Sequence, residues 1–241
     1  MAAHTPPDSS PLVYDIVQFP VVCTTVVVCI FTFAWINRDA AARVAACAFS
    51  FKAIVTDGQF DRVMLAQICH ESVVHLALNM SSLLSLRDLE TTLGPVVYLK
   101  LVLVLMLLSA AIMLLSSFVL YKHTRESSHL TSSSIGYSCV LFGMTSFQSL
   151  SHASSTVSIF GLRLPALFAP FVSLIMVSLL VPNASFSGHL GGIVAGFLTA
   201  ALSLHHALPL SFLATFPLLC TVSKYARWRA VFVAQRQWDS V

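Results

Sequence analysis

Apolar residues occupy six long stretches of the chain that contain no Asp, Glu, Lys or Arg. These stretches cover residues 16–37, 72–86, 101–121, 130–162, 164–184 and 186–204. A helix that crosses a bilayer needs about 20 predominantly apolar residues, so the pattern predicts six membrane-spanning helices. The fourth stretch is too long for one span, and its polar ends limit the predicted helix to about residues 135–151.

The segments outside these stretches divide the chain into three parts. We expect a short cytosolic tail at 1–15, a membrane domain at 16–205 with a long first loop at 38–62, and a C-terminal tail at 206–241. Two prolines interrupt the apolar start of the C-terminal tail, which favours an interfacial or re-entrant segment over a seventh span. The basic residues and tryptophans that follow favour an amphipathic segment on the cytosolic side. Six spans then place both termini in the cytosol and the first loop in the lumen.

The composition indicates a membrane protein and excludes several other classes. Apolar residues make up 57% of the 241 positions and charged residues 10%, against roughly 25% charged in soluble domains. The mean hydropathy is +0.85, so we expect one all-α polytopic membrane domain. The net charge of +3 is spread singly along the chain, which gives no footprint for nucleic acid. The six cysteines lack CxxC or paired spacing, so we expect neither a zinc site nor a disulfide framework.

Four polar residues lie in the predicted spans, where polarity is costly and points to function. His75 and Asn79 are four residues apart and project from one helix face. Ser138 lies at the start of the fourth helix, where free backbone N–H groups and the helix dipole favour a developing anion. His189 lies near the start of the sixth helix. A nucleophile, a base and two hydrogen-bond donors are the groups that acyl transfer requires.

Small residues accompany these candidates. Gly188, Gly192 and Gly196 repeat every four residues, a pattern that lets another helix approach closely. Gly136 and Cys139 lie on either side of Ser138 and are expected to pack beside the site. A single polar residue in a span more often packs or bonds its own helix than catalyses a reaction. The functional interpretation therefore depends on the combination.

Other classes of intramembrane protease do not fit the spacing. His70 and His75 resemble the zinc motif HExxH but have one residue too many, which would place them about 140° apart around a regular helix. The predicted spans also lack the two carboxylates that an aspartyl protease needs. We therefore expect no metal ion and no other cofactor.

Three motifs together resemble those of the rhomboid intramembrane serine proteases. His75 and Asn79 match the HxxxN of their second span, and GYSC at 136–139 resembles the GxSG that opens their fourth span. GHLGG at 188–192 matches the GHxxG of their sixth span. The resemblance covers about residues 57–197, and the sequences around Ser138 and His189 resemble small eukaryotic six-span members of the endomembrane system.

The resemblance implies a fold, a reaction and a setting. It implies a six-transmembrane-helix rhomboid-like bundle in which Ser138 attacks the scissile carbonyl and His189 acts as the base without a third residue. The backbone N–H of Ser138, His75 and Asn79 would hold the oxyanion. The implied substrates are single-span membrane proteins met in the lipid bilayer. The implied location is the endoplasmic reticulum or Golgi, with the plasma membrane as the alternative, and no oligomeric state is implied.

Two departures from the family pattern leave other functions open. Asp61 stands before Arg62 where the family has Trp, and Cys139 replaces the Gly that follows the nucleophile. A side chain beside the oxyanion site can reduce activity, so a rhomboid-like pseudoprotease that binds membrane clients is one alternative. A small transporter is the other, although paired Gly or Pro breaks within its spans would then be expected. The presence of both Ser138 and His189 favours an active enzyme.

Overall fold

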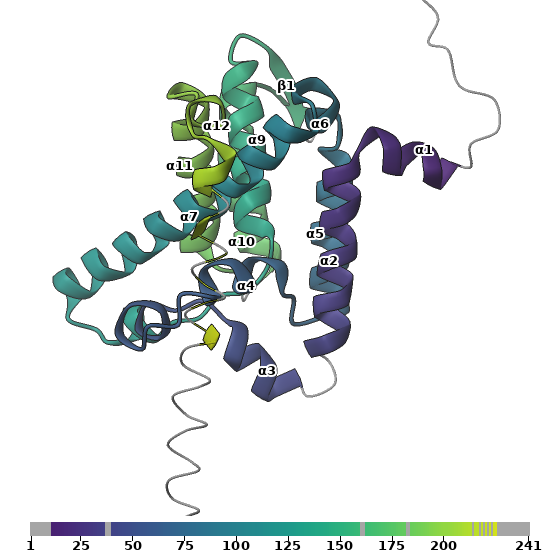
Figure 1. Ribbon diagram of the computed structural model, residues 1–241. Coiled ribbons are helices and arrows are strands. Elements are labelled where there is room, and N and C mark those ends of the chain that lie inside the picture. The colour runs from purple at the N-terminus through teal and green to yellow at the C-terminus, as the bar shows by residue number, and fades with distance from the viewer. Residues whose placement is uncertain are drawn as a thin grey trace, which may run out of the picture.

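The computed structural model describes residues 11–36, 40–159, 162–181 and 184–213, and residues 215, 216, 218, 220, 222, 224 and 225. The predicted N-terminal tail lies mostly outside these residues, as does the amphipathic tail beyond residue 225. The described part is a helical bundle with one small β-hairpin (Figure 1).

The described helices fall within or beside the six apolar stretches, which confirms the predicted positions of the main helices. Several short helices connect the longer ones, and the longer helices form the bundle. The N-terminal half contains α1 (Pro11–Gln18), α2 (Pro20–Ile36), α3 (Ala40–Cys47), the π-helical turn η1 (Lys52–Thr56), α4 (Arg62–Ile68), α5 (Val73–Ser85) and α6 (Asp88–Leu93). The C-terminal half contains α7 (Pro95–Thr124), α8 (Ser128–Thr131), α9 (Ser138–Ser151), the 3-10 turn η2 (Ala166–Phe168), α10 (Ala169–Leu180), α11 (Phe186–Ala201) and α12 (Leu204–Ala207).

One described helix, α7, is long and apolar enough to cross a membrane by itself. It has 30 residues. The apolar helices α2, α5 and α11 have 17, 13 and 16 residues, which is less than the roughly 20 residues that a complete span needs. The structure therefore confirms the predicted helical fold but does not by itself establish the predicted count of six spans.

Helix α9 lies at the centre of the bundle and packs mainly against α11 and α7 (Figure 1). Val140 and Met144 of α9 are fully buried in the main core with Leu101 and Leu105 of α7 and Ala195 of α11. This packing explains why a helix of only 14 residues is stable, since most helical stability in proteins comes from tertiary contacts.

The start of α2 is fastened to α6 by a buried carboxylate. Glu90 is fully buried, and its two oxygens accept hydrogen bonds from the backbone N–H groups of Val21 and Val22 at 2.8 and 2.9 Å. A carboxylate at a helix N-terminus satisfies free donors and complements the helix dipole. Glu90 therefore has a structural role, far in sequence from the helix that it caps.

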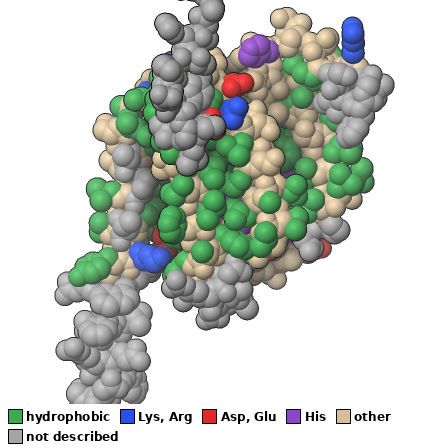
Figure 2. Space-filling model, turned by 90° about the vertical axis from the view of Figure 1, so that its right-hand side faces the viewer, with side chains coloured by type: hydrophobic (Ala, Val, Ile, Leu, Met, Phe, Trp, Pro, Cys, Tyr) green, Lys and Arg blue, Asp and Glu red, His purple; other side chains and the backbone are tan. Residues whose placement is uncertain are grey.

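Hydrophobic side chains cover the outer face of the bundle. In Figure 2 the middle of the visible face is mostly hydrophobic, and charged side chains lie toward its upper and lower edges. Large exposed side chains of α2 include Ile30, Phe31 and Trp35, and those of α5 include Val74 and Leu78. A continuous exposed apolar surface is typical of contact with lipid or with other proteins.

A β-hairpin between α9 and α10 was not predicted. Strand β1 (Thr156–Ile159) pairs antiparallel with β2 (Leu162–Pro165), and Val157 lies opposite Leu164. The fifth apolar stretch therefore begins as strand and 3-10 turn, and its α-helix starts only at Ala169. Hydropathy alone does not separate a short strand from a helix, because both can be continuous apolar runs.

The described residues that follow the start of α12 contact the rest of the protein at two places. Near α12, Lys100 Nζ donates to the carbonyl of His206 at 3.1 Å. At the other end, the Cys220 thiol donates to the Phe60 carbonyl at 3.3 Å, and Lys224 pairs with Asp61 at 3.5 Å. Lys224 therefore lies beside the end of the first loop, whereas the basic tail and this loop were expected on opposite sides.

Pro209 and the apolar residues that follow it explain why this segment contacts the bundle. Pro209 directly precedes a helical turn that begins at residue 210, a position where proline is tolerated because its missing N–H has no helical partner. Beyond it, Leu213 is buried and Phe216 packs against the cluster that contains Phe49 and Ile54 of the first loop. These apolar contacts hold the segment against the bundle.

Candidate active site

Ser138 and His189 meet at the same end of two adjacent helices. Ser138 is the first residue of α9, and His189 lies in the first turn of α11. The Nε2 atom of His189 is 2.9 Å from the Oγ atom of Ser138, within hydrogen-bond distance. The two residues are 51 positions apart in sequence. The structure therefore brings the predicted nucleophile and base together.

The imidazole of His189 is held in place by packing. The ring is buried and stacks on Phe142, one turn into α9, with ring centroids 4.5 Å apart. Ser185 caps α11 by accepting a hydrogen bond from the Gly188 N–H, which defines where this helix begins. Among the described residues, no hydrogen-bond partner lies at the Nδ1 atom of His189. Within the part of the chain that the structure describes, the arrangement is therefore a pair, without a third polar side chain bonded to the ring.

Gly136 allows His75 to approach the turn that precedes Ser138. Its backbone has φ +121°, a conformation that side-chain-bearing residues rarely adopt. A Cβ atom at this position would lie 2.6 Å from both Cε1 and Nε2 of His75 and 3.7 Å from Nδ2 of Asn79. The structure thus places both predicted oxyanion donors beside the backbone that leads into Ser138.

His75 and Asn79 share one face of α5, as their spacing predicts. The amide of Asn79 donates to the His75 carbonyl at 3.0 Å, and Asn79 is buried. Ser72 caps α5 through its side chain, which accepts from the His75 N–H. The start of α5 is therefore well defined at the position where its polar residues face the site.

His70 belongs to the same cluster, although sequence reasoning treated it only as part of a failed zinc motif. It precedes α5, so the angle calculated for a regular helix does not apply, and its ring meets that of His75 edge to face at 5.2 Å. Burial, followed by the charge of His75, lowers the pKa of His70 to about 4. The neutral ring can therefore accept the Tyr137 N–H at Nε2, 3.5 Å away. The described residues include no group of three or more side chains that could hold a metal ion.

The thiol of Cys139 is directed away from α11. It donates to Oε1 of Gln67 in α4 at 3.1 Å. The amide of Gln67 in turn donates to the carbonyls of Val63 and of Met106 in α7, at 2.7 and 3.0 Å. The Cys139 thiol therefore does not crowd α11, the predicted sixth span. It joins a buried hydrogen-bond network that connects α4, α7 and α9.

Two of the three predicted glycines form the contact between α11 and α9. A Cβ atom on Gly192 would lie 2.1 Å from the Cys139 carbonyl oxygen, and one on Gly196 would lie 2.1 Å from that of Gly143. Real Cβ contacts are never this short, so only glycine fits. Gly143 was missed as a packing residue, although its position four residues after Cys139 places it on the same face of α9.

Gly188 has different nearest neighbours from Gly192 and Gly196. The atoms nearest to a Cβ atom there would belong to the side chains of Ser185 at 3.0 Å and of Met113 in α7 at 3.5 Å. Gly188 therefore lies against its own helix cap and α7. The four-residue repeat predicted one continuous face, but the face that contacts α9 begins one turn later.

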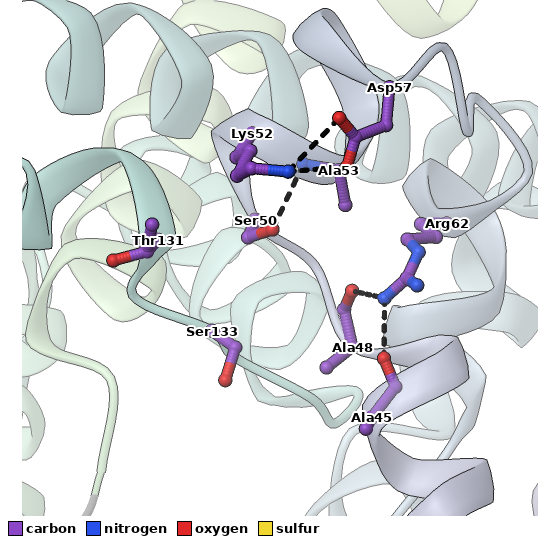
Figure 3. A pocket seen from close by; sticks show the side chains of 9 residues that line it. All are labelled: Ala45, Ala48, Ser50, Lys52, Ala53, Asp57, Arg62, Thr131 and Ser133. Atoms are coloured by element: carbon purple, nitrogen blue, oxygen red, sulfur yellow. Dashed lines mark hydrogen bonds and ion pairs between the residues drawn. The ribbon is translucent and has the colours of Figure 1, made fainter.

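Arg62 and Asp61 connect the first loop to the rest of the protein. An Nη1 atom of Arg62 donates to the carbonyls of Ala45 and Ala48 at 2.7 and 2.8 Å, at the end of α3 (Figure 3). These residues border a cavity of about 270 Å³ that contains none of the four candidate catalytic residues. Asp61, which replaces the family's Trp, instead pairs with Lys224.

Comparison with known families and proteins agrees with this geometry. The Rhomboid domain family matches residues 57–206. The chain is 35% identical over 139 residues to "Rhomboid-like protein 14, mitochondrial" from Arabidopsis thaliana, which covers 57% of this chain and 41% of that protein. It is 30% identical over 140 residues to "Rhomboid-related protein 4" from Homo sapiens, covering 58% of this chain and 44% of the relative.

A third relative has a name that states an activity. "Rhomboid-type serine protease 2" from Eremothecium gossypii is 29% identical over 141 residues, which is 58% of this chain and 52% of that protein. The match thus spans about half or less of each relative's length. Because the family match covers more than half of this chain and includes all four candidate site residues, the chain belongs to the rhomboid family.

Proposed function

We propose that this protein is an intramembrane serine endopeptidase that cleaves transmembrane segments of membrane proteins through Ser138 and His189. The observation that carries the proposal is the 2.9 Å contact between His189 Nε2 and Ser138 Oγ. A base within hydrogen-bond distance of a hydroxyl is the arrangement that activates serine as a nucleophile. Membership of a family that includes proteins named serine proteases supports the same reaction.

In the first half of the reaction, Ser138 Oγ attacks the scissile carbonyl carbon while His189 Nε2 takes the hydroxyl proton. The negative charge that develops on the carbonyl oxygen is stabilised by the Ser138 N–H and by the side chains of His75 and Asn79. Backbone N–H groups in the first turn of a helix have no helical acceptor and are available for this role. The tetrahedral intermediate collapses when His189 returns the proton to the leaving amine.

In the second half, water hydrolyses the acyl-enzyme. His189 takes a proton from the water as it attacks the ester carbonyl, and the same donors stabilise the second oxyanion. The proton then passes to Ser138 Oγ as the carboxylic acid product leaves. The stacking of the imidazole on Phe142 supports a fixed ring orientation in both halves without an acidic third residue.

The proposed substrates are single-span membrane proteins that approach through the lipid bilayer. The exposed apolar surface of the bundle supports a position within the membrane. We also propose an endomembrane location in the endoplasmic reticulum or Golgi. The name of one relative places that protein in mitochondria, so localisation of the tagged chain must accompany any search for substrates.

A pseudoprotease that binds membrane clients is the alternative, and the replacement of the family's Gly by Cys139 is the observation behind it. The hydrogen bond from the Cys139 thiol to Gln67 weakens that alternative. The bond directs the side chain toward α4 and not into the space between α9 and α11.

The test is cleavage of a single-span substrate with small, helix-destabilising residues, using purified protein in liposomes. Ser138→Ala is expected to abolish cleavage without loss of folded protein. Ser146→Ala is the matched control, because Ser146 is a buried serine of the same helix that bonds only the Phe142 carbonyl. Cleavage by Ser138→Ala at the wild-type rate would overturn the proposal.

A further inference from the structure

Two cysteines that are distant in sequence meet in the first-loop region. Cys47 is the last residue of α3, and Cys69 directly follows α4. Both are buried in one small cluster with Ile36, at the end of α2. The two buried side chains belong to the same packed cluster, and each thiol affects the ionisation of the other. The fold therefore creates a thiol pair that the sequence spacing did not reveal.

The segments that carry the two thiols are already fastened together at the end of α3. Arg62 of α4 donates to the carbonyls of Ala45 and Ala48, one on either side of Cys47 (Figure 3). Val44 and Leu65 pack against the same cluster. These contacts hold the two cysteine-bearing segments against each other, which is the condition that a disulfide between them requires.

The surroundings make the two thiols chemically unequal. Interaction with the Cys69 thiol lowers the pKa of Cys47, and the positive charges of Lys224 and Arg62 lower it further, against burial and the negative charge of Asp61. Interaction with the Cys47 thiol, together with burial, raises the pKa of Cys69. Because the thiolate is the nucleophile in thiol chemistry, Cys47 is the thiol prepared to react first.

We propose that Cys47 and Cys69 form a reversible disulfide that closes the first loop covalently. The oxidant is a small-molecule disulfide such as glutathione disulfide. The Cys47 thiolate attacks one of its sulfur atoms, forming a mixed disulfide and releasing one glutathione thiolate. Cys69 then loses its proton and attacks the Cys47 sulfur, which forms the protein disulfide and releases the second glutathione. Two protein thiols are oxidised, one glutathione disulfide is reduced, and both protons end on glutathione.

Other cysteines of the chain are engaged elsewhere. The Cys139 thiol donates to Gln67, the Cys220 thiol to the Phe60 carbonyl, and the Cys23 thiol to the Asp15 carbonyl at 3.6 Å. Cys29 is buried in the main core. The thiol pair is thus distinguished by two cysteines that share one buried cluster, not by burial alone.

The position of the thiol pair gives the disulfide a structural consequence. Cys69 directly precedes His70, whose ring contacts His75 and accepts the Tyr137 N–H. A covalent bond to α3 would restrict the connection between α4 and α5. Any effect of this restriction on cleavage rests on the proposed function, whereas formation of the disulfide does not.

The test is disulfide mapping of the full chain in liposomes. The protein is equilibrated with glutathione disulfide, free thiols are blocked with N-ethylmaleimide, and the digest is analysed by mass spectrometry without reduction. We expect a peptide cross-linked through Cys47 and Cys69 that disappears after dithiothreitol. The cross-link is expected to persist in Cys23→Ser, the matched control, and to be lost in Cys69→Ser with a glutathione adduct left on Cys47.

Glutathione adducts without the cross-link in the wild-type chain, or a cross-link to another cysteine, would overturn the proposal. Because the wild-type mapping is decisive, the test stands even if Cys69→Ser does not fold. In the reduced wild-type protein, Cys47 is expected to be alkylated faster than Cys69, and the reverse order would overturn the assigned direction of attack. Neither readout needs protease activity, so this proposal and the proposed function can fail separately.

Discussion

The two ends of the contact between α9 and α11 differ in chemistry although the same two helices form both. At one end, Ser138 and His189 face each other through polar atoms 2.9 Å apart. Further along, the backbone of Gly143 lies so close to Gly196 that no side chain fits between them. The close packing at the second end sets the helix separation, and that separation lets an imidazole reach a hydroxyl at the first. The glycines are thus part of the candidate site's geometry without contacting the reacting atoms.

The largest expected effect comes from the polar end. His189→Ala removes the base, and we expect cleavage to fall by roughly 10⁴-fold or more. The double variant with Ser138→Ala should be no worse, because two residues that act as one unit are not additive. His206→Ala is the control, because His206 is an exposed histidine of α12. Rates for the double variant far below those of either single variant would contradict the dyad.

The oxyanion donors should show a smaller, graded effect. We expect Asn79→Ala and His75→Ala each to slow cleavage by about 10²–10³-fold, which is the usual cost of one lost oxyanion donor. Reaction of Ser138 with a small phosphonate should persist, since these residues stabilise the transition state and do not create the nucleophile. Ser82→Ala controls for changes on α5, because that exposed side chain bonds only its own helix. Unchanged turnover in both donor variants would remove them from the mechanism.

The close-packed end can be disturbed independently. A Cβ atom on Gly196 would meet the Gly143 carbonyl at 2.1 Å, so Gly196→Ala should destabilise the fold by about 1–3 kcal/mol through overpacking. It should also lower cleavage per folded molecule by moving α11. Gly191→Ala is the matched control, since its Cβ would meet only the flexible Met113 side chain closer than 3.5 Å. Thermal unfolding and activity are measured together, and equal stability of the two variants would contradict the role given to the glycine contact.

The smallest expected effect on cleavage concerns Cys139. Cys139→Gly removes the bond to Gln67, leaves a buried acceptor unsatisfied and adds the helix cost of glycine, so we expect a loss of about 1–3 kcal/mol in stability. Cys139→Ser keeps a donor and should retain more stability and more activity per folded molecule. This order is read from urea unfolding and cleavage assays. Higher activity in Cys139→Gly than in the wild type would instead support a weakened enzyme.

The sequence predicted those parts of the site that depend on spacing along one helix. His75 and Asn79 share a face of α5, and Gly192 and Gly196 share a face of α11, because residues four apart align on any helix. The order of the motifs also placed Ser138 and His189 on different helices. Their contact at the same end of the bundle is a property of tertiary packing.

The parts that sequence reasoning missed depend on contacts between distant segments. The bond from Cys139 to Gln67 joins residues 72 positions apart, and the ion pair of Lys224 with Asp61 places Lys224 beside the first loop, where it was not expected. Neither leaves a periodic pattern in the sequence. The hairpin at 156–165 was missed because its apolar residues continue the pattern of the neighbouring spans.

The most direct test of the central claim is labelling of Ser138 by a fluorophosphonate probe, with the modified residue identified by mass spectrometry. The account predicts one labelled residue, Ser138, with labelling lost in Ser138→Ala, greatly slowed in His189→Ala and unchanged in Ser146→Ala. Labelling of Ser138 at the same rate with and without His189 would contradict the claim that this imidazole activates this hydroxyl.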